Sequence, residues 1–379
     1  MTLGPGDPSV AAVRRPQTDS LPRIPLLEAD ARPRRDVKVG IVGLGKMGVA
    51  HSAVLSMSPG VHIVGVADHH APLGKSLRGM GFNAPFFKSA EKLLRATTPD
   101  AVWICTQQSA HWPIARACLD AKAALFVEKP LTHTLDDAIE LAAMAGTSQR
   151  PVVCGYTLAF LPVFAAAQHA LASGAVGEVT RGSSSMNLSQ VFRAQRGWIV
   201  DPKRSGGGVV ANISSHLLFL LRWYLGMPVQ ARATWQKLYG EVEDDIRGAF
   251  ILPNGAEIGF ESSWSVSGYP FSAVVVEVEG SNGKLLVSND ALELDLLQAA
   301  GGWPAGHTWV RHTELPQPAR FDVNGEGYYL EDAHFLAWLT GGPAPPNTLE
   351  LALDVQRMMA ALYSSAGGDG GGALVPVPR

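Results

Sequence analysis

The residues best suited to chemistry are a lysine and a histidine in separate parts of the chain. Lys129 stands in the tripeptide Glu128-Lys129-Pro130, directly after the apolar run 125–127, and His216 follows the glycine triplet 206–208. An ammonium can stabilise negative charge that develops on an oxygen, and an imidazole can exchange a proton near neutral pH. Residues of these two types are able to serve proton transfer at a hydroxyl or carbonyl group, although the residues alone favour a satisfied helix histidine at position 216. Each also has an ordinary alternative, as a solvated lysine and a satisfied helix histidine.

A glycine-rich motif, Gly43-Leu44-Gly45-Lys46-Met47-Gly48, lies between an expected strand at 37–42 and an expected helix at 47–57. Glycines in this pattern permit a tight turn and close approach of the backbone to a pyrophosphate at the helix N-terminus. Asp68 follows Gly48 by twenty residues and ends the next expected strand. A carboxylate there binds ribose hydroxyls and repels a 2'-phosphate. The motif therefore predicts NAD, with NADP as the alternative.

Short apolar runs alternate with amphipathic segments through the first half of the chain. Strands are expected at 63–67, 101–105 and 124–127, and helices at 89–96 and 111–121. This alternation is typical of an α/β domain in which helices cover a parallel sheet. We therefore predict a Rossmann dinucleotide-binding domain over residues 36–157, which would place Lys129 at the edge of the sheet where ligands bind.

The second half of the chain has strand-like patterning separated by turn signals such as Pro253-Asn254-Gly255. The expected elements are a helix at 162–172, strands at 229–237, 246–252, 257–264 and 273–279, and helices at 328–339 and 349–364. These predict an α+β domain over residues 158–367, with a large, mostly antiparallel sheet. Residues 1–35 and 368–379 are expected to be flexible tails.

Composition and charge exclude several classes of protein. The 379 residues carry a net charge of −3, which gives no basic face for nucleic acid. The longest strongly apolar run, 217–221, is far shorter than the ~20 residues that cross a bilayer. Cys105, Cys118 and Cys154 have neither disulfide nor metal-ligand spacing. We expect a cytoplasmic protein with no metal site, no nucleic-acid partner and no membrane segment.

Together these motifs resemble the glucose-fructose oxidoreductase/inositol dehydrogenase (Gfo/Idh/MocA) family, over nearly the whole chain. Besides the glycine motif, Asp68 and the Glu-Lys-Pro tripeptide, the resemblance is carried by Thr106 with His111, Gly155-Tyr156, the glycine triplet, His216, and the final helix ending in Tyr363-Ser364-Ser365-Ala366. It implies hydride transfer between NAD(P) and a secondary hydroxyl or ketone of a sugar, nucleotide-linked sugar or cyclitol. It also implies a homo-oligomer, either a dimer or a tetramer.

The resemblance implies roles for individual residues. Lys129, His216 and Asn212 are the expected catalytic residues. The expected cofactor contacts are Gly43, Leu44, Gly45, Lys46, Met47, Gly48, Asp68, Thr106, His111, Glu128 and Lys129. The expected substrate contacts are Lys129, Tyr156, Arg193, Trp198, Asn212 and His216. Asn212 and His216 are four residues apart in a segment that becomes helical, so both can face one side.

The chain departs from the family pattern at three positions. Asn212 and Phe219 stand where many relatives carry Asp, and Ala159 stands where many carry Arg. A neutral amide does not raise the pKa of an imidazole as a carboxylate does, so we predict a neutral His216 at neutral pH. The departures leave two alternatives open: a catalytically silent dinucleotide-binding regulator, and a glycoside hydrolase that works by transient oxidation with NAD.

Overall fold

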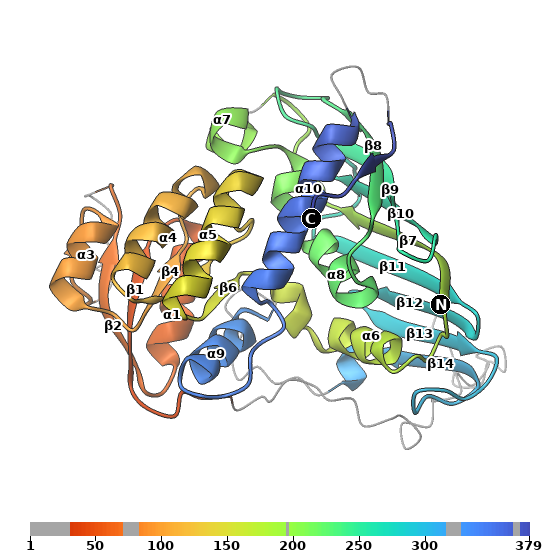
Figure 1. Ribbon diagram of the computed structural model, residues 1–379, viewed down its shortest axis with the longest axis horizontal. Coiled ribbons are helices and arrows are strands. Elements are labelled where there is room, and N and C mark those ends of the chain that lie inside the picture. The colour runs from red at the N-terminus through yellow and green to blue at the C-terminus, as the bar shows by residue number, and fades with distance from the viewer. Residues whose placement is uncertain (1–30, 71–82, 195–196, 316–326, 367–371) are drawn as a thin grey trace, which may run out of the picture.

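The computed structural model describes residues 31–70, 83–194, 197–315, 327–366 and 372–379, which form two sheet domains side by side (Figure 1). In the first domain the parallel strands run in the order β3-β2-β1-β4-β5-β6. Their bounds are β1 Val37–Val42, β2 Val61–Ala67, β3 Phe86–Phe87, β4 Ala101–Ile104, β5 Ala124–Val127 and β6 Val152–Cys154. This is the Rossmann order, and it confirms the predicted α/β class.

Helices cover both faces of this sheet because its strands are apolar on both sides. Val102, Ile104 and Leu125 face the helices of one side, and Trp103 and Phe126 face those of the other. The first set of helices is α3 (Ala90–Thr97), α4 (His111–Asp120) and α5 (Leu135–Ser148). The second is α1 (Lys46–Met57) and α9 (Tyr328–Leu339), which pack against each other. Thus α9 returns from the far end of the chain to complete the first domain (Figure 1).

The second sheet contains nine strands in the described residues, in the order β14-β13-β12-β11-β7-β10-β9-β8-β15. Its pairs are antiparallel, except that β7 and β10 are parallel. The prediction of a mostly antiparallel sheet is confirmed. The bounds are β7 Val179–Asn187, β8 Gln230–Gln236, β9 Asp245–Ile251, β10 Glu257–Ser263, β11 Ala273–Gly280, β12 Gly283–Ser288, β13 Ala291–Leu296, β14 Gly306–Arg311 and β15 Val375–Pro376.

Three helices lie on one face of this sheet: α6 (Pro162–Ala172), α8 (Ser215–Leu225) and α10 (Leu349–Ala366) (Figure 1). Alternate residues of β10, Ile258 and Phe260, are buried beneath them, in the period-two pattern of a strand with one covered face. α10 contacts α5 of the first domain as well as α8 and β8 of the second. This helix therefore fixes the two sheets relative to each other and holds the cleft between them.

The C-terminal end differs from the expected tail. Val375 and Pro376 form β15, which pairs with β8, and Val377 is buried. Pairing at the exposed edge of β8 satisfies backbone groups that a free tail would leave to water. Near the other end, the Arg34 amide donates to the Thr340 hydroxyl. The rest of the expected N-terminal tail, residues 1–30, lies outside the described residues. The predicted domain boundary between residues 157 and 158 stays a prediction. Within the described ranges, no helix combines the length and the apolar character that a membrane span needs.

Candidate active site

The glycine loop after β1 has the shape that a dinucleotide pyrophosphate requires. Gly43 has a φ of +90°, and an added Cβ would lie 2.7 Å from the Cys105 backbone. Gly45 is exposed, and a Cβ there would point into open space. Since α1 begins at Lys46 with neither a side-chain cap nor an acidic residue in its first turn, its first amides are left to bind an anion. The loop therefore fits the predicted role of residues 43–48.

Asp68 lies at the end of β2 with its carboxylate fixed against the glycine loop. One oxygen accepts the Leu44 amide and the other accepts the His70 amide, each at 2.8 Å. The side chain is 11% exposed, whereas that of its neighbour His69 is 98% exposed. An oriented carboxylate with residual access suits ribose recognition, as the spacing from Gly48 predicts.

A cleft of about 340 Å³ opens between the two domains, at the carboxyl edge of the parallel sheet. Trp198, which is 43% exposed, lies in its wall, and the Thr106 hydroxyl is buried beside it without a hydrogen-bond partner in the described residues. The cleft is lined by Thr106, Gln108, Lys129, Pro130, Trp198, Ile199, Ser205, Gly207, Ala211 and Asn212.

Lys129 projects from the end of β5 to the segment that follows the glycine triplet. Its ammonium donates to the Asn212 backbone carbonyl at 2.8 Å, with the Asn212 side-chain oxygen at 3.4 Å. Asn212 lies in a single π-helical turn, Val210–Ser214, that precedes α8. The shared helix face expected for Asn212 and His216 stays a prediction; both residues are close to the Lys129 ammonium, which lies 3.4 Å from the Asn212 side-chain oxygen and whose charge acts on His216.

His216 lies in the first turn of α8, close enough to Lys129 for the two charges to interact. Burial, together with the Lys129 ammonium, lowers the pKa of His216 well below its usual value. Its Nδ1 has no hydrogen-bond partner in the described chain. The direction of this shift agrees with the predicted neutral imidazole at neutral pH, and its causes are burial and the neighbouring Lys129 cation.

Tyr156 does not have the surface position expected of a substrate contact. It is fully buried, stacks on Phe219 with ring centroids 4.7 Å apart, and meets the His216 ring edge-on at 5.9 Å. Phe219 thus stacks on the Tyr156 ring, which in turn meets the edge of the His216 ring. Because a buried ring cannot touch a ligand in this conformation, we correct its role from substrate contact to support of the imidazole.

Of two further assignments, one needs correction and one stays a prediction. His111 is buried, and its ring nitrogens lie 3.0 and 3.1 Å from the Pro130 and Thr106 carbonyl oxygens. It holds together the two loops that line the cleft, which replaces the predicted direct cofactor contact. Arg193 is exposed and, like His216, lies outside the described cleft lining, so its substrate contact stays a prediction.

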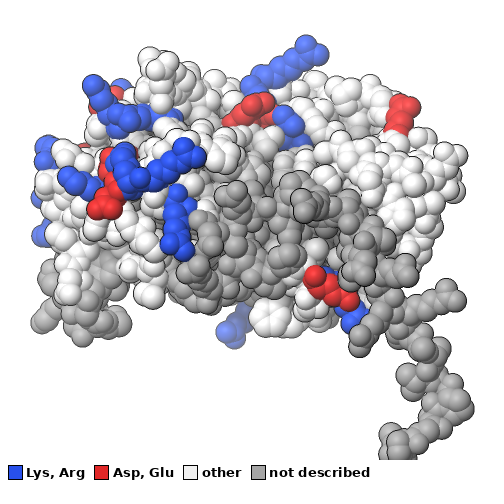
Figure 2. All heavy atoms as spheres, turned by 90° about the horizontal axis from the view of Figure 1, so that it is seen from below, with Lys and Arg blue, Asp and Glu red and all other residues white. Residues whose placement is uncertain are grey.

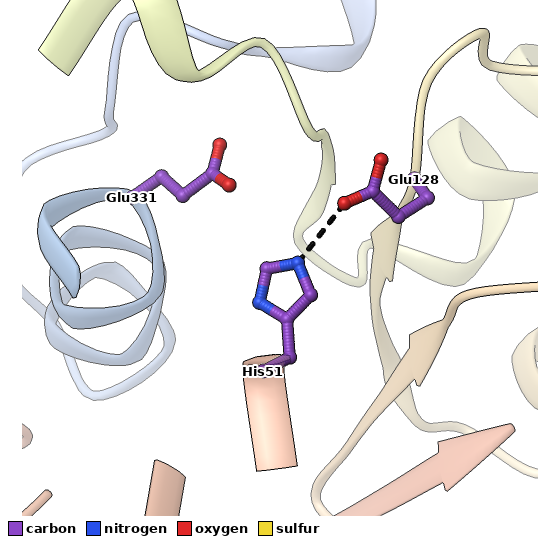
Figure 3. A group of neighbouring side chains, drawn as sticks. All are labelled: His51, Glu128 and Glu331. Atoms are coloured by element: carbon purple, nitrogen blue, oxygen red, sulfur yellow. Dashed lines mark hydrogen bonds and ion pairs between the residues drawn. The ribbon is translucent and has the colours of Figure 1, made fainter. Parts of the chain in front are cut away.

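Glu128, which was predicted to contact the cofactor, belongs instead to a buried group of charged side chains (Figure 3). One carboxylate oxygen lies 3.0 Å from His51 Nε2, and the other accepts the Lys129 amide at 3.1 Å. His51 comes from α1, and Glu331 and Asp332 come from α9. We call His51, Glu128, Glu331 and Asp332 the His51 cluster; its only sequence signal was an acidic pair inside an expected amphipathic helix.

The His51 cluster predicts an effect of pH on stability through Glu331. Burial raises the pKa of Glu331 well above its ordinary value of 4.5, and neither carboxyl oxygen has a hydrogen-bond partner in the described residues. Above pH 4.5 the unfolded chain releases a proton that the folded chain keeps, so stability falls as pH rises until the folded pKa is passed. Glu331→Gln removes this loss.

In urea unfolding, we expect the Glu331→Gln variant to gain stability over the wild type between about pH 5 and 8, by up to about 1.4 kcal/mol per pH unit. Glu140→Gln, at an exposed position on α5, is the matched control and should show no such slope. A stability difference that stays constant with pH would mean that Glu331 is already ionised in the folded protein.

The glycine triplet is anchored by a residue that sequence reasoning missed. One oxygen of the buried Glu243 carboxylate accepts the Gly208 and Val210 amides at 2.8 and 3.1 Å, and also the Tyr363 hydroxyl at 2.8 Å. A Cβ on Gly208 would lie 2.0 Å from the Glu243 carbonyl oxygen. Close backbone packing therefore requires glycine here, and it sets the position of the turn that carries Asn212.

Comparison with known families agrees with this geometry. Residues 37–156 match the model described as the oxidoreductase family with an NAD-binding Rossmann fold, and residues 164–286 match the GFO/IDH/MocA C-terminal domain. The chain belongs to the Gfo/Idh/MocA family of NAD(P)-dependent oxidoreductases. Its first domain is an NAD-binding Rossmann domain, as the glycine loop and Asp68 indicate.

Individual relatives match most of the chain. It is 26% identical over 346 residues to inositol 2-dehydrogenase 2 of Paenarthrobacter aurescens, covering 86% of this chain and 96% of the relative. It is 22% identical over 354 residues to D-glucoside 3-dehydrogenase of Escherichia coli, covering 87% and 95%.

Solved structures with similar folds include levoglucosan dehydrogenase with NADH and levoglucosan, at a TM-score of 0.80 and 19% identity, covering 91% of this chain and 100% of that one. They also include GenD2 from gentamicin A biosynthesis with NAD, at a TM-score of 0.75 and 26% identity, covering 91% and 97%.

Proposed function

We propose that this protein transfers a hydride between NAD and a secondary hydroxyl or ketone of a sugar or cyclitol, with Lys129 and His216 as its catalytic residues. The observation that carries the proposal is convergence: the Lys129 ammonium, the Asn212 turn and the Thr106 loop line one cleft beside a loop shaped for a dinucleotide. The names of the relatives support this substrate class, since they include an inositol 2-dehydrogenase and a glucoside 3-dehydrogenase.

The residues divide the chemistry between them. When bound, the nicotinamide ring supplies the hydride acceptor for oxidation or the hydride donor for reduction. Neutral His216 takes the hydroxyl proton during oxidation and returns it during reduction. Lys129 donates a hydrogen bond to the reacting oxygen and stabilises the charge that develops there. The Asn212 backbone carbonyl accepts a hydrogen bond from the Lys129 ammonium and holds it in place. Trp198, in the wall of the cleft, offers a flat apolar surface to the ring of a sugar or cyclitol.

The proposal is tested by incubating the protein with NAD and a panel of compounds, and by following the absorbance of reduced nicotinamide. The panel contains myo-inositol, alkyl glucosides, anhydro-sugars and nucleotide-linked sugars. We expect reduction of NAD with at least one of them. Binding of NAD with no reduction by any member would favour the silent regulator, and release of the aglycone from a glucoside without net reduction would favour glycoside hydrolysis by transient oxidation.

Asp68 should set the preference for NAD over NADP. Its carboxylate is fixed by the Leu44 and His70 amides, so it would repel the 2'-phosphate of NADP and could not rotate to avoid it. Asp68→Asn keeps an acceptor oxygen and removes the charge. We expect the ratio of the Kd for NADP to the Kd for NAD to fall by about tenfold or more, which is about 1.4 kcal/mol. His69→Gln, at the exposed neighbouring position, is the control; an unchanged ratio in Asp68→Asn would remove Asp68 from cofactor selection.

We further propose that the protein works in the cytoplasm as a homo-oligomer, a dimer or a tetramer. In the described residues, helices cover one face of the nine-stranded sheet (Figure 1), and the other face is the one that we assign to a second copy. Figure 2 shows Lys and Arg side chains on the Rossmann-domain side of one face with acidic side chains among them, and a mostly uncharged surface over the sheet domain. The absence of a nucleic-acid partner stays a prediction.

A further inference from the structure

The His51 cluster lies directly behind the tripeptide that supplies Lys129. His51 is fully buried on α1, the carboxylate of Glu128 follows β5, and Asp332 is fully buried on α9. The Trp103 indole N–H donates to Asp332 at 2.8 Å, and the Phe126 ring lies 4.8 Å from the His51 ring. Three elements from distant parts of the chain therefore meet at one imidazole.

The positions of two carboxyl groups around the ring indicate the charge state of that imidazole. Nδ1 lies 2.9 Å from both Asp332 oxygens, and Nε2 lies 3.0 Å from a Glu128 oxygen. A histidine donates from both nitrogens only when it is protonated. Although burial opposes the charge, the Asp332 and Glu128 carboxylates raise the pKa of His51 well above its usual value. His51 is therefore an imidazolium held between two carboxylates.

A metal ion is the other occupant that this group of side chains could hold. Ligand atoms of His51, Glu128 and Glu331 lie within 4.8 Å of one another (Figure 3). A metal needs an unprotonated ring nitrogen, however, and both nitrogens of His51 already face carboxylate oxygens at hydrogen-bond distance. The geometry favours a proton over a metal ion.

We propose that His51 is a positioning residue for Lys129 and acts through the Glu128 carboxylate. This inference rests on the proposed function, which gives Lys129 its role. The imidazolium fixes one Glu128 oxygen, and the other oxygen accepts the Lys129 amide at 3.1 Å. Glu128 thereby fixes the Lys129 backbone, from which the ammonium reaches Asn212. Gly155 keeps the space clear, because a Cβ there would lie 3.3 Å from the Glu128 carboxyl group.

The proposal predicts that loss of the imidazolium loosens Lys129 without unfolding the protein. Gln cannot donate from two opposite sides, so His51→Gln leaves Glu128 free to turn. We expect Lys129 to react several-fold faster with trinitrobenzenesulfonate, as read by peptide mass spectrometry, and kcat on the best panel substrate to fall by about tenfold or more. The Kd for NAD should stay within about threefold of the wild-type value, since the glycine loop and Asp68 are untouched.

Val54→Ala is the matched control, because Val54 is buried on the same helix and belongs to the core rather than to the cluster. It lowers Tm through lost packing and should leave both the Lys129 labelling rate and kcat unchanged. Glu128→Gln and the double variant complete the test. If His51 acts through Glu128, the double variant is no worse than the more severe single variant.

Three results would overturn the inference: labelling of Lys129 in His51→Gln at the Val54→Ala rate, independent effects of the two substitutions in the double variant, or a stoichiometric metal in the purified wild-type protein. If His51→Gln does not fold, Glu128→Gln decides alone by the same labelling readout. Labelling needs no substrate. A protein that turns over no compound of the panel would therefore contradict the proposed function, while the labelling rate would still test the positioning role of His51.

Discussion

Lys129→Met is expected to lower kcat by about a thousandfold while the Kd for NAD stays within about threefold of the wild-type value. Methionine keeps much of the side-chain length and apolar stem but removes the ammonium, which is the group that reaches the Asn212 carbonyl at 2.8 Å. The developing charge on the substrate oxygen then has no cation beside it. Binding of NAD should persist because the glycine loop and Asp68 lie on other loops of the sheet.

The matched control for this prediction is Lys92→Met, at an exposed lysine on α3, which should retain wild-type kcat. A second consequence follows from the charge pair, since the Lys129 ammonium contributes to the lowered pKa of His216. In Lys129→Met the pKa of His216 should rise toward its usual value. Near-wild-type turnover in Lys129→Met would remove this residue from the chemistry.

His216→Gln is expected to lower kcat by about 10²- to 10⁴-fold, the usual contribution of a general acid-base group, with a smaller effect on KM. The imidazole is also responsible for the pH profile. Because burial and Lys129 lower the pKa of His216, the base form is present at neutral pH, and it is lost only as pH falls through the lowered pKa. The rate of oxidation should therefore be flat around neutral pH and fall on the acid side.

In His216→Gln the acid limb of this profile should disappear along with most of the activity. His169→Gln, at a half-buried position on α6, is the control and should keep both the rate and the profile. An acid limb that survives in His216→Gln would assign the proton transfer to another group.

The parts of the fold and site that depend on local sequence could be predicted. The glycine motif, the strand before it and Asp68 lie close together in the chain, and each residue type is required by a backbone or charge constraint within that unit. Lys129 was found because proline marks the strand end that carries it. The second sheet followed from period-two patterning and turn residues, although the parallel pairing of β7 with β10 leaves no local signal.

The parts that depend on long-range packing could not be predicted. His51 meets Asp332 across 281 positions of sequence, and nothing near either residue indicates the other. Tyr156 looked like a substrate contact because aromatic rings stack on sugars, but Phe219 from a distant helix covers it. The π-helical turn at Asn212 directly follows a glycine triplet that Glu243 anchors through a tertiary contact.

Transfer of deuterium tests the central claim most directly. The protein is incubated with NAD and the most active panel compound, deuterated at its carbinol carbons, and the isotope content of the reduced nicotinamide is measured by mass spectrometry. The account predicts one deuteron in the product from wild-type protein, and no product above background from Lys129→Met. Reduced nicotinamide without deuterium, or equal deuterium transfer by Lys129→Met, would contradict hydride transfer at a cleft organised by Lys129.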